Sequence, residues 1–400
     1  MMGWSISKMS EVTNIISGGT PKSGISDYWF GDVKWITPKD MGKITGIYVS
    51  ETGRNITRLG LEKSSAKLIP ESSVILSTRA PIGHLAINKV PMATNQGCRG
   101  LVPKSTLDTK FLYYFLLKSV SLLNDLGSGT TFKELSKTAL EKVEIPHPEI
   151  TEQKRIVAIL DQAFADIEQA RAKAEQNLKN ARELFESYLQ QVFSLRGEGW
   201  VEITLGDAAE VSTGGTPLKS KNEFWDGDIP WYSSGELNDT FTIESKSCIT
   251  AAGLDGSNAK ILPEGSLLVG MYDTAALKMS ILDRDGAFNQ AIAGVKPNNR
   301  INLEFILHSI NSIKPELLKL RRGVRQKNLN KSKIKGIPIR LPSLSEQNQV
   351  VEELRLIRRN TDDLAVIYTQ KLNDLDELKK SILQKAFSGE LTKEKEGAVA

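Results

Sequence analysis

The sequence of 400 residues contains few of the residues that bind metals or form disulfides. It has two cysteines, Cys98 and Cys248, and three histidines, His84, His147 and His308. The cysteines lie in segments that do not resemble each other, and the histidines are scattered along the chain. The sequence therefore predicts neither a disulfide nor a zinc site.

Long apolar runs and a secretion signal are also missing. The best apolar stretch, FLYYFLLKSVSLL from Phe111, is interrupted by Lys118 and is shorter than the roughly 18 residues that a membrane span needs. The N-terminal segment MMGWSISKMS does not have the pattern of a signal peptide. We therefore expect a cytoplasmic protein with no membrane partner.

The common catalytic and cofactor-binding motifs are absent from the sequence. It has no GxGxxG or GxxxxGK[ST] phosphate loop, no HExxH, no GxSxG and no CxxC pair. The Asn/Asp-Pro-Pro-aromatic run with which methyltransferases hold a target amine is missing as well. A binding protein without catalytic residues, metal or cofactor is therefore the favoured class.

Charge permits a nucleic-acid partner but does not require one. The chain has 52 Lys and Arg against 48 Asp and Glu, a net charge of +4 and a pI near 8.8. Because a nearly balanced surface is common in soluble proteins, the positions of the basic groups matter more than their sum.

The sequence repeats itself over nearly its whole length, and the offset between matching residues drifts only from 193 to 196. Trp29 and Trp225, for example, are 196 residues apart. The matching segments are GGTPKSGISDYWFGDVKWI from Gly18 and GGTPLKSKNEFWDGDIPWY from Gly214; AKLIPESSVIL from Ala66 and AKILPEGSLLV from Ala259; Asn95-Gln96 and Asn289-Gln290; GTTFKELSK from Gly129 and GVRQKNLNK from Gly323; and PEITEQ from Pro148 and PSLSEQ from Pro342.

Each half begins with short runs rich in Val, Ile, Thr and Gly, which are typical of strands in a compact mixed globule. Each half ends in a segment that starts at a hydroxyl-Glu-Gln cap and contains no Pro or Gly for more than 40 residues, so we expect a long helix there. The predicted boundaries are 1–147 for the first globule, 148–196 for the first helix, 197–341 for the second globule, 342–390 for the second helix and 391–400 for a tail.

The two long segments carry apolar or small residues at steps of three and four, which predicts a coiled-coil seam. We expect the two helices to pair antiparallel, because each would otherwise expose its apolar stripe. The fold class is therefore α+β: two mixed α/β globules joined by two long antiparallel helices, with a pseudo-twofold internal repeat. The predicted seam residues are Ile156, Leu160, Ala163, Ile167, Ala170, Ala174, Leu178, Ala181, Leu184 and Tyr188 in one helix and Val350, Leu354, Ile357, Thr361, Leu364, Tyr368, Leu372, Leu375, Leu378 and Ile382 in the other.

Positions where the halves differ within a shared frame are candidates for reading different ligands. Lys133 and Lys327 coincide and suit a phosphate, whereas Thr130 and Thr131 correspond to Val324 and Arg325 in the other half. Arg and Gln side chains can contact base edges in pairs of hydrogen bonds. The candidate nucleic-acid contacts are Lys22, Arg79, Thr130, Thr131, Lys133, Lys219, Lys221, Tyr272, Arg322, Arg325, Gln326 and Lys327.

Some residues have two interpretations at this level. Loop lysines are often plain solvated surface. The repeated tryptophans fit core or turn packing better than base stacking. The identical Asn-Gln pairs, 95–96 and 289–290, can either reach bases or make structural hydrogen bonds, and the sequence does not separate these roles.

The ordered motifs, all present twice, resemble the specificity subunit of type I restriction-modification systems over about the whole chain. The resemblance implies that each globule, a target-recognition domain, reads one half of a split site in double-stranded DNA. It also implies that the helices set the gap and dock two modification (methyltransferase) subunits, which restriction (endonuclease and translocase) subunits then join. The S-adenosylmethionine and nuclease sites of the family lie on those other subunits. One departure is that Tyr272 stands where Arg79 stands in the first half.

Two other classes remain open from the residues alone. One is a non-enzymatic coiled-coil scaffold whose globules bind protein or glycan, and the other is an enzyme with an unrecognised active site.

Overall fold

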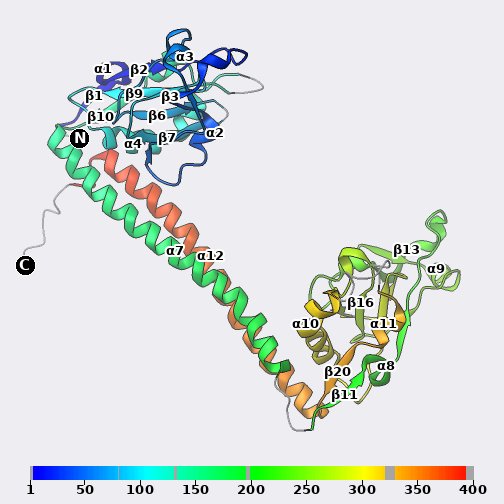
Figure 1. Ribbon diagram of the computed structural model, residues 1–400. Coiled ribbons are helices and arrows are strands. Elements are labelled where there is room, and N and C mark those ends of the chain that lie inside the picture. The colour runs from blue at the N-terminus through cyan, green and yellow to red at the C-terminus, as the bar shows by residue number, and fades with distance from the viewer. Residues whose placement is uncertain (1–2, 80, 130–132, 195–198, 320–328, 393–400) are drawn as a thin grey trace, which may run out of the picture. The chain divides into compact units, whose positions relative to one another are not determined.

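The computed structural model describes residues 3–79, 81–129, 133–194, 199–319 and 329–392. The chain divides into two compact units, Met1–Glu175 with Gln370–Ala400, and Gln176–Thr369. Each unit contains one globule and adjoining parts of two long helices, α7 (Ile150–Ser194) and α12 (Leu344–Ser388), drawn in green and in orange to red in Figure 1. Within the described ranges no helix is both long and apolar enough to cross a membrane.

The described part of the first globule forms two larger sheets and one strand pair. The central strand of the first sheet, β6, is buried along its whole length, as its sequence VILST predicts for a strand covered on both faces. The five-stranded sheet has the order β2 (Thr13–Ser17), β9 (Cys98–Pro103), β6 (Val74–Thr78), β7 (Ile82–Asn88), β4 (Tyr48–Val49); the three-stranded sheet has the order β5 (Arg54–Ile56), β3 (Trp29–Ile36), β8 (Met92–Thr94); and β1 (Ser5–Lys8) pairs with β10 (Glu144–His147).

The second globule repeats this plan, with shorter strands in its first sheet. The first of its four-stranded sheets has the order β12 (Val211–Thr213), β19 (Ile292–Val295), β16 (Leu267–Gly270), β17 (Met279–Ile281); the second has the order β14 (Ser247–Ile249), β13 (Trp225–Tyr232), β18 (Gly286–Phe288), β15 (Ile261–Leu262); and β11 (Val201–Thr204) pairs with β20 (Pro338–Leu341). Strands β3 and β13 pair antiparallel on one side and parallel on the other. Both have a register shift after their first tryptophan, between Trp29 and Val33 in β3 and between Trp225 and Ile229 in β13.

Helices fill the connections and cover the sheets. The helices of the first unit are α1 (Met9–Val12), η1 (Ser26–Tyr28), α2 (Pro38–Met41), α3 (Arg58–Glu62), α4 (Thr109–Lys118), α5 (Val120–Asp125) and α6 (Lys137–Glu141). Those of the second unit are α8 (Leu205–Ala208), η2 (Asn222–Phe224), η3 (Ser234–Glu236), α9 (Ala251–Asp255), η4 (Asp273–Ala275), α10 (Leu303–Lys319) and α11 (Lys331–Lys335).

The long helices pair antiparallel within each unit. In the first unit the early part of α7 packs on the late part of α12, where Glu168 bonds Lys379 at 3.0 Å. In the second unit the late part of α7 packs on the early part of α12, where Tyr188 bonds Glu353 at 3.3 Å. Helices α4 and α10 dock onto these pairs through aromatic rings, so each globule shares its core with both long helices.

The seam differs from the predicted one at three leucines. Leu184, Leu364 and Leu378 are 49%, 37% and 46% exposed. The helix regions instead bury Phe164, Phe185, Leu189 and Leu383, each less than 9% exposed. A helix with 3.6 residues per turn drifts away from a 3.5-residue stripe, and each globule presses on its part of the pair as a third partner, so the buried face rotates along the rod.

A buried glutamine fixes the start of each long helix. Gln153 Nε2 donates to the carbonyls of Thr106 and Pro148 at 2.9 and 2.8 Å, and its Oε1 accepts from the Asp108 amide at 2.8 Å. Gln347 makes the corresponding bonds to Arg300, Pro342 and Asn302. The repeated Glu-Gln motif is therefore a structural clamp between the start of each helix and the segment before α4 or α10.

Candidate nucleic-acid interface

The Gly-Gly-Thr-Pro turn lies wedged between two backbone segments in each unit. A Cβ atom on Gly18 would lie 1.9 Å from the Asn95 carbonyl oxygen, and one on Gly19 would lie 2.3 Å from Ser65 Oγ. In the second unit the corresponding distances are 2.0 Å from the Phe288 oxygen for Gly214 and 2.3 Å from Asn258 C for Gly215. Only glycine fits these positions, which explains why the pair is repeated.

The tryptophans hold this turn in place. Trp35 Nε1 donates to the Gly19 carbonyl at 3.0 Å, and Trp29 Nε1 donates to the Lys22 carbonyl at 3.3 Å. The two rings meet edge to face at 5.2 Å. Trp225 and Trp231 make the same bonds at the same distances in the second unit. These rings therefore pack as the repeat indicated and shape the loop that carries Lys22.

The sequence left open whether the Asn-Gln pairs make structural hydrogen bonds or reach bases, and in the structure the two residues of each pair differ in this respect. Asn95 Oδ1 accepts from the Gly97 amide at 3.0 Å, and Asn289 Oδ1 accepts from the Ala291 amide at 3.0 Å, so both asparagines close the turn. The glutamines that follow, Gln96 and Gln290, are exposed. The asparagine is structural, whereas the glutamine faces solvent.

Three chain segments lie side by side next to this turn in each unit. In the first unit Thr78 N donates to the Gly97 carbonyl and Leu135 N donates to the Thr78 carbonyl, both at 2.8 Å. In the second unit Met271 N donates to Ala291 and Leu329 N donates to Met271, both at 2.9 Å. We call residues 78–79, 95–97 and 134–135, with their counterparts 271–272, 289–291 and 329, the recognition edge.

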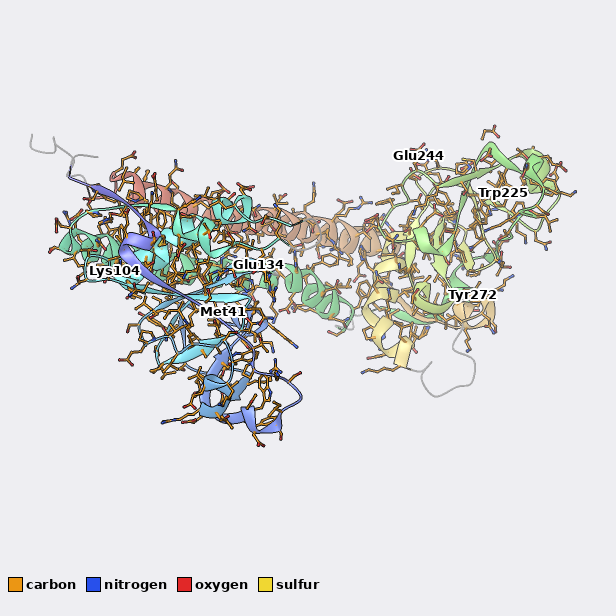
Figure 2. All side chains as sticks on the ribbon, turned by 90° about the horizontal axis from the view of Figure 1, so that it is seen from above. Met41, Lys104, Glu134, Trp225, Glu244 and Tyr272 are labelled. Atoms are coloured by element: carbon orange, nitrogen blue, oxygen red, sulfur yellow. The ribbon has the colours of Figure 1, made fainter. Side chains whose placement is uncertain are left out.

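Two of the candidate residues, Arg79 and Lys133, lie at the recognition edge of the first unit. Arg79 follows β6 and forms an ion pair with Glu134 at 3.5 Å, and both side chains are partly exposed (Glu134 is labelled in Figure 2). Lys133 precedes Glu134 and is exposed. Exposed ion pairs are weak, about 0–1 kcal/mol. Glu134 therefore orients the Arg79 side chain but leaves it able to bind another partner. Thr130 and Thr131 lie outside the described residues.

The second unit presents a different side chain at the same place. Tyr272 follows β16 on the recognition edge and is exposed (Figure 2). The side chains of Arg322, Arg325, Gln326 and Lys327 lie outside the described residues. Their role as nucleic-acid contacts therefore stays a prediction.

The loop lysines after the Gly-Gly-Thr-Pro turn differ in their surroundings. Lys22 and Lys219 are exposed. The Lys221 ammonium already has two partners, because its Nζ lies 3.8 Å from Glu223 and 4.8 Å from the centre of the Phe224 ring. Of the three lysines, Lys22 and Lys219 are the better placed to bind an anion.

One divergent position was missed by the sequence analysis. Phe30 is 91% exposed and has a φ of 65°, and its counterpart Asp226 has a φ of 59°. A bulky residue with positive φ is uncommon and its strain is typical of functional loops. The signal was available, because YWFGDV and FWDGDI differ at this position inside an otherwise matching motif.

Cys98, which follows Gly97 of the recognition edge, has an unreactive thiol. Burial, with a smaller contribution from Asp40, raises the pKa of the Cys98 thiol to about 12. At neutral pH the sulfur is therefore protonated and is a poor nucleophile.

Two similar globules define a two-module binding protein. Each is joined to paired long helices and has a recognition edge that is partly buried but whose glutamine, Gln96 or Gln290, is exposed. Residues 1–176 and 197–373 each match the type I restriction modification DNA specificity domain, and the chain belongs to this family. The resemblance noted from the repeated motifs is thereby confirmed.

Relatives and solved structures agree with this assignment. The chain is similar to the type I restriction enzyme MjaIX specificity subunit of Methanocaldococcus jannaschii, with 33% identity over 66% of this chain and 65% of the relative. It is also similar to the EcoR124I/EcoR124II specificity subunit of Escherichia coli, with 30% identity over 61% of this chain and 62% of the relative. The matched region thus spans less than two thirds of either relative's length.

Two solved structures share the fold. One is a chain from a study of complex assembly and conformational transition of the type I R-M system, with a TM-score of 0.78, 19% identity and coverage of 98% of this chain and 99% of that chain. The other is the HsdS subunit from Thermoanaerobacter tengcongensis, with a TM-score of 0.69, 18% identity and coverage of 98% of both chains.

Proposed function

We propose that this chain is the DNA-reading specificity subunit of a type I restriction-modification complex and that it is not itself catalytic. Each globule reads one half of a split site in double-stranded DNA. The observation that carries the proposal is the recognition edge, which has the same backbone frame in both units but carries Arg79 in one and Tyr272 in the other. A shared frame with different side chains suits two readers of different half-sites.

The residues divide into two kinds of contact. Lys22, Lys133, Lys219, Lys221 and Lys327 hold phosphates, and their contribution weakens as salt rises. The remaining candidates test base edges in the major groove, where Arg and Gln can form paired bonds with guanine and adenine. These base-reading residues are Arg79, Thr130, Thr131, Tyr272, Arg322, Arg325 and Gln326.

The partners supply the chemistry. Two modification (methyltransferase) subunits dock on the long helices, and each acts on an adenine that it flips out of its half-site. Restriction (endonuclease and translocase) subunits join that complex. The 45-residue helices α7 and α12 set the separation of the half-sites, because a helix of that length is about 68 Å long and stiff when paired. We place the boundaries of the reading globules at residues 1–147 and 197–341.

Mapping methylated adenines in the host with and without this gene tests the proposal. We expect one split motif to lose its methylation when the gene is removed and to regain it when the gene is restored. An unchanged methylation pattern, together with no sequence-dependent retention of DNA by the purified complex, would instead favour a scaffold.

A further inference from the structure

A threonine and a glutamine form the same hydrogen bond in both units. Thr20, in the Gly-Gly-Thr-Pro turn, donates its hydroxyl to Gln96 Oε1, and Thr216 donates to Gln290 Oε1. The bond joins segments 76 residues apart in the first unit and 74 apart in the second. Neither glutamine is part of the core, since both are exposed.

The bond fixes the direction of the amide. Because the carbonyl oxygen is held by the threonine, the Nε2 group points away from the turn and offers two N–H donors. No other hydrogen bond reaches either Nε2 from the part of the chain that the structure describes. The turn beneath is rigid, since Asn95 closes it and Gly19 N donates to the Thr94 carbonyl at 2.8 Å.

The donor lies on the recognition edge. A Cβ atom on Gly97 would lie 3.4 Å from Arg79 Cγ, so the residue after Gln96 lies next to the side chain that differs between the halves. On its other side the threonine is two residues from the exposed Lys22. The turn that carries Gln96 therefore lies next to Arg79, which is proposed to read bases, and its partner Thr20 is close in sequence to Lys22, which is proposed to hold phosphate.

Identity in both halves indicates what this donor binds. A glutamine that read a base would impose the same base on both half-sites, whereas the residues around it have diverged. The group that is the same in every half-site is the phosphate backbone, which carries no sequence information. We propose that Gln96 and Gln290 each donate an N–H bond to a phosphate oxygen and so set the register of their globule on the duplex; this rests on the proposed function.

Substitutions that change the charge at Gln96 test the proposal. The measurement is the DNA affinity of the full chain in complex with its methyltransferase partners. Gln96→Glu replaces the donors with a negative group of the same shape, and we expect the affinity to fall about tenfold on every duplex tested. Gln96→Lys restores a phosphate donor and should bind within about threefold of the wild type. The methylated motif should be unchanged in both variants, and the melting temperature should be unchanged because the side chain is exposed.

Asn14→Asp, at an exposed position of β2 in the same unit, is the matched control for the change in net charge and should leave the affinity unaltered. Removing the orienting hydroxyl by Thr20→Val should weaken binding in the same sequence-independent manner. The inference is overturned if Gln96→Glu binds as tightly as the wild type, or if it alters one base of the motif, because the glutamine would then be a base reader. Absence of DNA binding by the wild-type complex would instead overturn the proposed function itself.

Discussion

A single buried side chain decides where each long helix begins. Gln153 and Gln347 are fully buried, and each satisfies two carbonyls and one amide of the segment that it touches. The sequence showed the Glu-Gln motif as a helix start, but the tertiary contacts of the glutamine depend on a segment about 45 residues earlier and could not be predicted from a local pattern.

We predict that Gln153→Ala lowers the free energy of unfolding by about 3 kcal/mol, because three buried backbone groups lose their partner. Gln162→Ala, in the same helix but at an exposed residue that bonds the exposed Asp166, should change the free energy of unfolding by less than about 0.5 kcal/mol. Urea denaturation of both variants measures the difference. Equal effects would show that Gln153 does not clamp the helix.

A buried histidine makes the second unit sensitive to acid. Burial, with smaller contributions from the nearby Arg358 and Arg355, lowers the pKa of His308 to about 4. An unfolded histidine titrates near pH 6.5, so the unfolded chain binds more protons between these values. Stability from this group is therefore complete above pH 6.5 and is lost as the pH falls toward 4.

The first half has Tyr114 at the position of His308, which suggests the variant His308→Tyr. We expect the wild type to lose up to about 3 kcal/mol more stability than this variant between pH 7 and pH 4. Thermal melting of both proteins across this range provides the comparison. Parallel pH profiles would mean that His308 is not held neutral.

At the scale of elements, the two globules dock onto their helices with opposite charges. Lys110 of α4 bonds Asp161 of α7 at 2.6 Å, and Glu304 of α10 bonds Arg355 of α12 at 3.0 Å. Residues 110 and 304 correspond in the repeat, as do 161 and 355, so both members of the pair changed sign together. A joint change of this kind is what a maintained contact requires.

The same exchange occurs in the seam between the long helices. Lys379 of α12 lies 5.0 Å from the ring centre of Phe164 on α7, whereas Arg358 of α12 lies 3.7 Å from that of Phe185 on α7. Residues 164 and 358 correspond, as do 185 and 379, so cation and ring have swapped places. Each half therefore complements the other better than it would complement a copy of itself.

We predict that Glu304→Lys alone lowers the free energy of unfolding by about 3–5 kcal/mol, because it places a second positive charge beside Arg355 at a buried position. Adding Arg355→Asp recreates the pair found in the first half and should recover most of the loss. Glu352→Lys, which breaks an exposed bond to the same arginine, should cost less than about 1 kcal/mol. Additive effects in the double variant would contradict the coupling.

The sequence predicted the elements better than their contacts. The long helices, the strand-rich globules and the antiparallel pairing followed from the repeat and from the apolar periodicity. The burial of Phe164 and Phe185 in place of Leu184, Leu364 and Leu378 did not, since it depends on α4 and α10 pressing against the rods. At the recognition edge, Arg79 and Tyr272 were identified by comparing the halves, whereas the orientation of Gln96 needed the coordinates of Thr20.

At the scale of the whole molecule, each unit is composite. The first unit combines the N-terminal globule with the last part of α12, and the second combines the other globule with the end of α7 and the start of α12. Neither half of the sequence therefore completes its own core. Each unit therefore depends on both long helices, and in the proposed function the two helices together set the gap between the half-sites.

We expect helical heptads inserted in both long helices to widen the gap between the half-sites. Insertions after Glu175 in α7 and after Thr369 in α12, made together, keep the pairing and add about 10 Å, or roughly three base pairs. The spacing in the methylated motif of the complex measures the change. An unchanged gap would contradict the proposal that the long helices set the separation of the half-sites.

The most direct measurement of the central claim uses a variant in which residues 1–145 are replaced by those of a relative with a different site, and maps the motif that the complex containing this variant methylates. The account predicts that one half of the split motif changes to that of the relative while the other half and the gap stay the same. A motif in which both halves change, or in which neither does, would contradict two independent readers in one chain.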